Sequence, residues 1–156
     1  MHAYRSRPGG KTAGALMFLL LLCGAILRAD FCLAAGALAV ALPADVVKGG
    51  FSYGYSRNYP DINQAEAHAL DLCRTTKDAA ANADLRALCK VIQDFSDQCV
   101  AIAMDPAAGT PGVGWGIAAN SATAQSLAMS NCKKTAGPSR RAFCKVDNTG
   151  CDGTAQ

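Results

Sequence analysis

The cysteines of this chain follow one pattern twice. In each copy an alanine-rich, helix-like run ends in a cysteine, a polar stretch leads to the tripeptide Cys-Lys-Val, and one further cysteine closes the copy. The first copy supplies Cys73, Cys89 and Cys99, and the second supplies Cys132, Cys144 and Cys151. Regularly spaced cysteines in an even number indicate a disulfide framework. We therefore predict a duplicated module that is stapled by disulfides.

The duplication constrains how these cysteines pair. Spacing alone does not choose among the many pairings that six cysteines allow. A pattern that occurs twice is expected to pair the same way twice, which predicts Cys73–Cys89 and Cys132–Cys144. Each of these bridges would stabilise the fold by ~3 kcal/mol if it acts on chain entropy. The remaining pair, Cys99–Cys151, would tie the end of one copy to the end of the other.

Metal binding and redox chemistry are the alternatives for these cysteines. Zinc sites usually present cysteines two to four residues apart, or cysteine with histidine, and redox proteins often present Cys-x-x-Cys. Residues 36–156 contain neither arrangement. We therefore predict structural disulfides, with no metal ligands and no cofactor.

The first 35 residues have the pattern of an export signal. Residues 2–11 carry basic side chains and no acid, residues 13–27 are apolar, and small residues follow. A basic start, a short apolar segment and a small-residue exit are typical of a signal peptide. We predict that residues 1–35 are such a leader, cut after Ala34 or Ala35, and that the protein is secreted or periplasmic.

The alternative is an uncleaved leader, whose apolar character would continue to Leu42 and hold the protein at a membrane. Arg28 and Asp30 interrupt that stretch, and charge inside a membrane span is costly, so cleavage is favoured. Without the leader the chain has eleven basic and eleven acidic residues. It then lacks the basic field that nucleic acid requires, and no nucleic-acid partner is expected.

Residues 36–156 are expected to form one domain of two repeats, about 36–98 and 99–151. In each repeat two short apolar or alternating runs precede a capped helix, and the Cys-Lys-Val segment follows as a strand. The expected strands are 36–42, 51–56 and 88–92 in the first repeat and 100–104, 113–118 and 143–146 in the second. An insert at about 75–85 lengthens the first repeat.

Strict alternation in 51–56 and 113–118 places large side chains on one face of each strand and Gly, Ala or Ser on the other. Glycine inside a strand often marks close approach by another element. A helix is therefore expected on the small face, and the other repeat or solvent on the large face. The result is an α+β fold of two tandem strand-strand-helix-strand repeats, packed as one pseudo-symmetric, disulfide-stapled domain.

Capping residues and apolar stripes predict the two helices. Asp61, with Gln64 three residues later, is expected to cap the first helix, and Ser121 the second, which Gly137 and Pro138 are expected to end. The inner stripes are expected to be Ala65, Ala69, Leu72 and Cys73, and Ala124, Leu127, Ala128 and Cys132.

These motifs resemble a known bacterial family. The resemblance rests on the repeated Ala-Ile-Ala-like strand, the Tyr53-Gly54 and Trp115-Gly116 pairs, the cysteine-ended alanine helices and the two Cys-Lys-Val strands. Together they are similar to the family catalogued as domain of unknown function 4189, over about residues 36–151. The resemblance implies a small exported protein with the domain doubled, and it supplies no catalytic residues.

Few side chains indicate chemistry. His68 is the one histidine of residues 36–156, and a general base needs a nucleophile and an orienting group in reach. Acidic residues are scattered singly, unless folding pairs two of them, as Glu66 with Asp94, in the way a glycosidase requires. No glycine-rich phosphate loop is present in this sequence. We predict no catalytic residues, and the chain is not expected to be an enzyme.

The aromatic residues near the second strand are the best candidates for recognition. Tyrosine combines a large area with a polar tip. Tyr53 is expected to pack against Trp115 in the core, whereas Tyr55 and Tyr59 form a possible binding patch. The sequence thus favours a non-enzymatic binding or effector-like module that engages another protein or an envelope component. The alternatives are a small periplasmic or secreted hydrolase and an envelope protein tethered by an uncleaved leader.

Overall fold

The computed structural model describes residues 34–156, which lie within one compact unit of the chain. The predicted leader, with its cleavage, therefore falls outside the described residues except for Ala34 and Ala35. Ala35 is already the first residue of a strand. No helix in residues 34–156 is long and apolar enough to cross a membrane.

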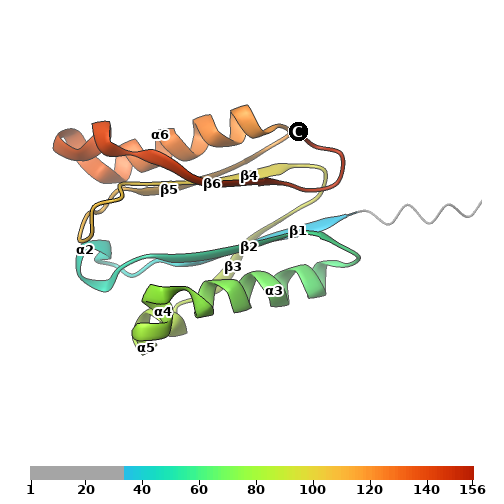
Figure 1. Ribbon diagram of the computed structural model, residues 1–156, viewed down its shortest axis with the longest axis horizontal. Helices are drawn as coiled ribbons and strands as arrows, with labels where there is room; N and C mark the ends of the chain where they lie inside the picture. Colours follow the sequence, from blue (N-terminus) through green and yellow to red (C-terminus); the bar gives the residue numbers. More distant parts are fainter. Residues whose placement is uncertain (1–33) are drawn as a thin grey trace, which may run out of the picture. The chain divides into compact units, whose positions relative to one another are not determined.

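Residues 34–156 form two three-stranded antiparallel sheets with helices, so the predicted α+β class is confirmed (Figure 1). The first half comprises β1 (Ala35–Ala41), α2 (Val46–Gly49), β2 (Ser52–Tyr59), α3 (Ile62–Thr75), α4 (Lys77–Ala81), α5 (Ala83–Ala87) and β3 (Lys90–Phe95). The second half comprises β4 (Cys99–Met104), β5 (Val113–Ala118), α6 (Ser121–Arg140), the short 3₁₀ helix η1 (Arg141–Phe143) and β6 (Lys145–Cys151). The six strands fall close to the six expected segments.

The two sheets have the same order. The first strand of each half lies in the middle, giving β2-β1-β3 and β5-β4-β6. In the first sheet Leu38 lies opposite Tyr55, and in the second Ile102 lies opposite Trp115. The insert of the first half is the pair of short helices α4 and α5. The order of the strands and the long helix thus matches between the halves, whereas α2 lies only in the first half. Pseudo-symmetry between their backbones stays a prediction.

One face of each sheet is built from small residues and carries a helix, as the alternation predicted. A Cβ atom added to Gly54 would lie 2.4 Å from the Ala69 carbonyl oxygen of α3. One added to Gly114 would lie 2.3 Å from the Cys132 nitrogen of α6. Real Cβ atoms do not approach backbone so closely, so only glycine allows the helices to lie this near the strands. α3 and α6 lie on the outer faces of the two sheets (Figure 1).

The large faces of the two sheets meet each other. Leu38, Val40 and Phe95 from the first sheet form one buried cluster with Val100 and Ile102 from the second. Tyr53, Tyr55, Trp115 and Ile117 pack at the margin of the same cluster. The bulky core therefore joins the halves, while the alanine-rich clusters beneath the helices belong to one half each.

The helix starts confirm one predicted cap and correct the other. The Asp61 carboxylate accepts a hydrogen bond from the Gln64 amide at 2.9 Å and caps α3. For α6 the prediction of Ser121 was wrong, because Asn120 is the N-cap and accepts from the Thr123 amide at 2.9 Å. Asn120 has the extended backbone that a cap requires, and Ser121 is the first helical residue.

The inner stripes were right for the small residues and wrong for the leucines. Ala65, Ala69 and Cys73 of α3 are fully buried, as are the corresponding residues Ala124, Ala128 and Cys132 of α6. Leu72 and Leu127 instead stay about 37% and 44% exposed. A Cβ atom added to Gly54 or Gly116 would lie 2.5 Å from the Cβ of Leu72 or Leu127, respectively. The helices are therefore so close to the strands that only small side chains fit beneath them. Gly137, with a φ of 73°, breaks the regular helix within α6 near the predicted end.

All three predicted disulfides are present. Cys73–Cys89 joins the last turn of α3 to the residue before β3, and Cys132–Cys144 joins the middle of α6 to the residue before β6. Cys99–Cys151 joins two residues that lie opposite each other in β4 and β6. The third bridge was expected to connect the two copies, but Cys99 begins the second sheet, so the bridge lies inside the second half.

Candidate binding site

The structure places Tyr55 and Tyr59 in different side-chain clusters. Tyr55 packs at the inter-sheet cluster, and its hydroxyl donates to Asn148 Oδ1 at 2.9 Å. Burial raises the pKa of Tyr55 above its ordinary value. A register shift and the positive φ of Asn58, 59°, interrupt the alternation before Tyr59. Tyr59 consequently packs with the cluster beneath α3. The two are not joined in one cluster, and the Tyr55–Tyr59 patch stays a prediction.

Tyr53 behaves like Tyr55. It lies half-buried at the inter-sheet cluster, and its hydroxyl donates to the Asp147 carboxylate of β6. Burial, followed by the hydrogen bond and charge of Asp147, raises the pKa of Tyr53 well above its ordinary value. This tyrosine is therefore a neutral hydrogen-bond donor that connects the two halves.

Within residues 34–156 no hydrogen bond or ion pair joins the side chains considered for acid–base chemistry. His68 is exposed on α3, where its ring lies 5.2 Å from that of Tyr59. Neither the Glu66 nor the Asp94 side chain makes a hydrogen bond or ion pair with a described residue. Within residues 34–156 no group of three His, Cys, Asp or Glu side chains is arranged to hold a metal ion. The six cysteines of this part of the chain are all in disulfides.

The β1–β2 connection, which contains α2, and the β4–β5 connection lie near each other at one end of the sheets (Figure 1). Two hollows are lined by residues of these connections. A cleft of about 770 Å³ extends between the segment 42–47, the start of β5 and one side of α6. A second hollow of about 460 Å³ lies between α2, the 105–112 connection and α5. We call the first of these the α2–α6 cleft. Its volume is in the range of small-molecule sites.

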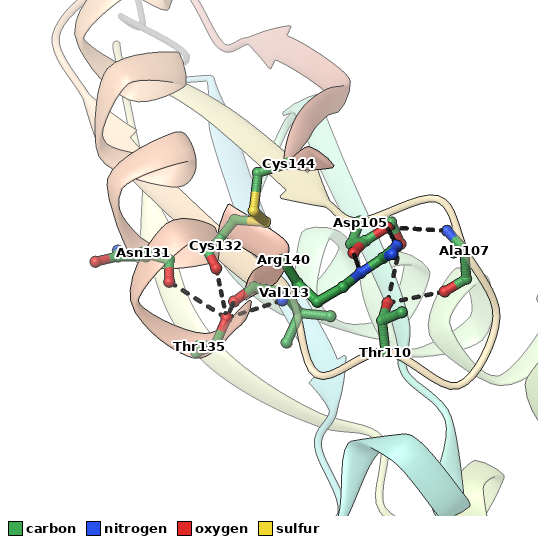
Figure 2. The surroundings of a disulfide bond; sticks show 9 residues. All are labelled: Asp105, Ala107, Thr110, Val113, Asn131, Cys132, Thr135, Arg140 and Cys144. Carbon is green, nitrogen blue, oxygen red and sulfur yellow. Dashed lines mark hydrogen bonds and ion pairs between the residues drawn. A yellow bond between two sulfur atoms is a disulfide. The ribbon is translucent and has the colours of Figure 1, made fainter. Parts of the chain in front are cut away.

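Side chains of α6 fix the β5 wall of this cleft. The Thr135 hydroxyl accepts from the Val113 amide at 2.9 Å and donates to the Val113 carbonyl at 2.7 Å (Figure 2). Asn131 Nδ2 donates to the Trp115 carbonyl at 2.8 Å. β5 is an edge strand, and unpaired edge groups are open to a further strand. Here two side chains of α6, Thr135 and Asn131, bond to the edge at Val113 and Trp115. These bonds hold Trp115 in place at the wall of the cleft.

An ion pair between the buried Asp105 and the partly exposed Arg140 fixes the connection beside the cleft. Arg140 Nε and Nη2 donate to the two Asp105 carboxylate oxygens at 2.7 and 2.8 Å (Figure 2). The Ala107 amide also donates to Asp105, at 3.1 Å. The Asp105 side chain is fully buried, and the hydrogen bond from Arg140 is the main cause that lowers its pKa below the ordinary value. The same pair raises the pKa of Arg140. Bidentate geometry of this kind orients both partners.

The polar side chains at the cleft differ in whether they already have a hydrogen-bond or ion-pair partner within the protein. Asp45 caps α2 by accepting from the Lys48 amide at 3.2 Å, and its carboxylate lies 3.6 Å from Lys48 Nζ. Lys134 is exposed, and its ammonium group makes no ion pair or hydrogen bond with a described residue. No described residue accepts a hydrogen bond from the indole N–H of Trp115. The cleft thus combines an apolar wall with one uncompensated positive charge.

Sequence reasoning missed this cleft. Trp115 was expected to pack against Tyr53 in the core, and no local pattern singled out Lys134. Asp105 and Arg140 are 35 residues apart, so no local pattern pairs them. No local pattern identifies the cleft, because its walls come from three segments that only the folded halves bring together.

The fold described here is an α+β arrangement of two disulfide-bonded sheet-and-helix halves. A family model, "Domain of unknown function (DUF4189)", matches residues 35–151, nearly all of the described chain. The chain therefore belongs to that family, as the motifs had indicated. A search of curated proteins and a search of solved structures found no match.

Proposed function

We propose that this chain is an exported, non-enzymatic binding protein whose partner, an envelope component or another protein, presents an apolar group to the α2–α6 cleft. The observation that carries this proposal is the cleft itself, with Leu42, Val47 and Trp115 at its surface. Leu42 and Val47 are 44% and 47% exposed. Apolar concave sites with a few polar groups are the usual form of a ligand site.

The disulfides support the export part of the proposal. Such bonds persist mainly in oxidising compartments, and three are present in residues 34–156. The leader pattern of residues 1–35 is the second support. No hydrogen bond joins His68 to a carboxylate of a described residue. This favours binding over hydrolysis, since an acid–base mechanism requires groups in hydrogen-bond reach of one another.

Fluorescence tests this proposal directly, because Trp115 is the single tryptophan of the chain. The oxidised protein is titrated with the uncharged probe N-phenyl-1-naphthylamine (NPN). It is also titrated with 8-anilinonaphthalene-1-sulfonate (ANS), which adds one sulfonate to the same ring system. We expect saturable quenching of Trp115 with one probe bound per chain. If neither probe binds in this way, the proposed function is wrong.

Two matched variants locate the binding. Leu42→Asp places a charge at the cleft, whereas Leu88→Asp changes a leucine of nearly equal exposure, 43% against 44%, that does not line it. Loss of an apolar contact costs about 1.5 kcal/mol, which corresponds to about tenfold in affinity. We expect that loss for Leu42→Asp and unchanged binding for Leu88→Asp. Equal effects of the two variants would place the probe elsewhere.

A further inference from the structure

The α2–α6 cleft carries its polar groups in an unequal arrangement. The segment 42–47 supplies apolar side chains and the single carboxylate, Asp45. That carboxylate already caps α2 and lies beside Lys48. The α6 side supplies Lys134, which has no described ion-pair partner. The α6 rim of the cleft therefore carries the positive charge of Lys134 without a described anionic partner, and the rest of the cleft surface is mainly apolar.

From this arrangement we infer that the ligand of the cleft is a small amphiphilic anion, with an apolar body against Leu42, Val47 and Trp115 and a single anionic group at Lys134. A carboxylate, sulfonate or phosphate monoester would supply that group. The inference rests on the proposed function and specifies the ligand class of the same site. Charge complementarity favours this occupant over a neutral one, since an ammonium group without a partner attracts an anion at its rim.

The fixed wall strengthens the inference. Asn131 and Thr135, which flank Lys134 on α6, are both bonded to the backbone of β5. These bonds fix the position of the Lys134 backbone relative to Trp115, while the lysine side chain stays free to turn toward a ligand. Trp115 of β5 and Lys134 of α6 therefore belong to one rigid unit and face the same cleft. That arrangement suits a planar or chain-like body that ends in a charge.

The two probes test the ligand class, because they share one ring system and differ by one sulfonate. We expect ANS to bind roughly three to ten times more tightly than NPN, the range for an exposed charge contact with hydrogen bonds. Raising the salt concentration should weaken ANS and leave NPN nearly unchanged. Lys134→Gln should bring the affinity for ANS down to that for NPN.

Lys133→Gln is the matched control. Lys133 is also exposed on α6, and its substitution changes the net charge equally, but it does not line the α2–α6 cleft. It should leave the preference for ANS in place. Equal affinity for the two probes, or equal effects of the two lysine variants, would overturn the inference about the anion while leaving the binding function standing. Absence of binding by both probes would remove the function itself.

Discussion

At the scale of single residues, backbone-directed polar side chains define where elements begin and how loops close. Asn120 starts α6, Thr135 and Asn131 secure β5, and Asp105 organises the connection between β4 and β5. None of these roles depends on an unusual residue type. Each depends on one oxygen or nitrogen placed within hydrogen-bond distance of a backbone or guanidinium group.

The α6 cap distinguishes two neighbouring residues that look equally suitable in sequence. Asn120→Ala should lower the free energy of unfolding by about 1 kcal/mol, because the Thr123 amide loses its acceptor. Ser121→Ala should change it by only a few tenths of a kcal/mol, since Ser121 is already helical. Urea denaturation of both variants measures the difference. If Ser121→Ala lost more stability than Asn120→Ala, Ser121 would be the N-cap, as the sequence first suggested.

The Asp105–Arg140 pair predicts a pH dependence with a definite sign. Arg140 lowers the pKa of Asp105 in the folded chain. The ionised carboxylate therefore stabilises the fold above its unfolded pKa of about 3.9, and this contribution is lost as the pH falls through the lowered folded pKa. Arg140→Gln should be less stable than the native protein at neutral pH, and the gap should narrow below about pH 4.

Arg141→Gln provides the control for that measurement. Arg141 is exposed and has the same charge, but it makes no ion pair with a described residue. Thermal unfolding of the three proteins from neutral to acidic pH would show the effect. A stability gap for Arg140→Gln that stays constant through this range would contradict the assigned role of the ion pair.

At the scale of elements, the sequence predicted what depends on local pattern and failed where distant segments meet. Strict alternation and the small residues identified the strands and the faces that receive α3 and α6. The repetition of the cysteine pattern led to all three disulfide pairs. Leu72 and Leu127 have helical periodicity suited to an inner stripe, but they stay partly exposed, because the helices lie too close to the strand glycines for a large side chain to fit between them. That distance is a tertiary property, so periodicity alone did not predict it.

The Cys73–Cys89 bridge is expected to stabilise the first half. It closes a loop of sequence separation 16 that contains both α4 and α5. Replacing both cysteines with alanine avoids a free thiol and should lower the free energy of unfolding by about 3 kcal/mol. Chemical denaturation under oxidising conditions measures this loss. The reduced native protein should lose at least as much stability, and an unchanged midpoint in the alanine variant would show that the bridge does not act as a staple.

At the scale of the whole described unit, the two halves meet without a covalent bridge between residues 34–95 and 99–151. Each of the three disulfides lies within one half. The bulky inter-sheet cluster joins the halves, together with the hydrogen bonds of Tyr53 to Asp147 and Tyr55 to Asn148. The α2–α6 cleft exists only because this packing brings the segment 42–47 to β5 and α6. The sequence leaves open whether the large faces meet the other half or the solvent, so it does not predict the site.

The packing of the halves is tested most directly by nuclear Overhauser contacts between the Tyr55 ring and Gly150. These residues are distant in sequence, yet a Cβ atom added to Gly150 would lie 2.6 Å from Tyr55 Cε2. In the oxidised protein we predict strong contacts between the Tyr55 ring protons and the Gly150 α-protons. If the Tyr55 ring shows contacts only with residues of its own half, the sheets do not face each other and the cleft does not form.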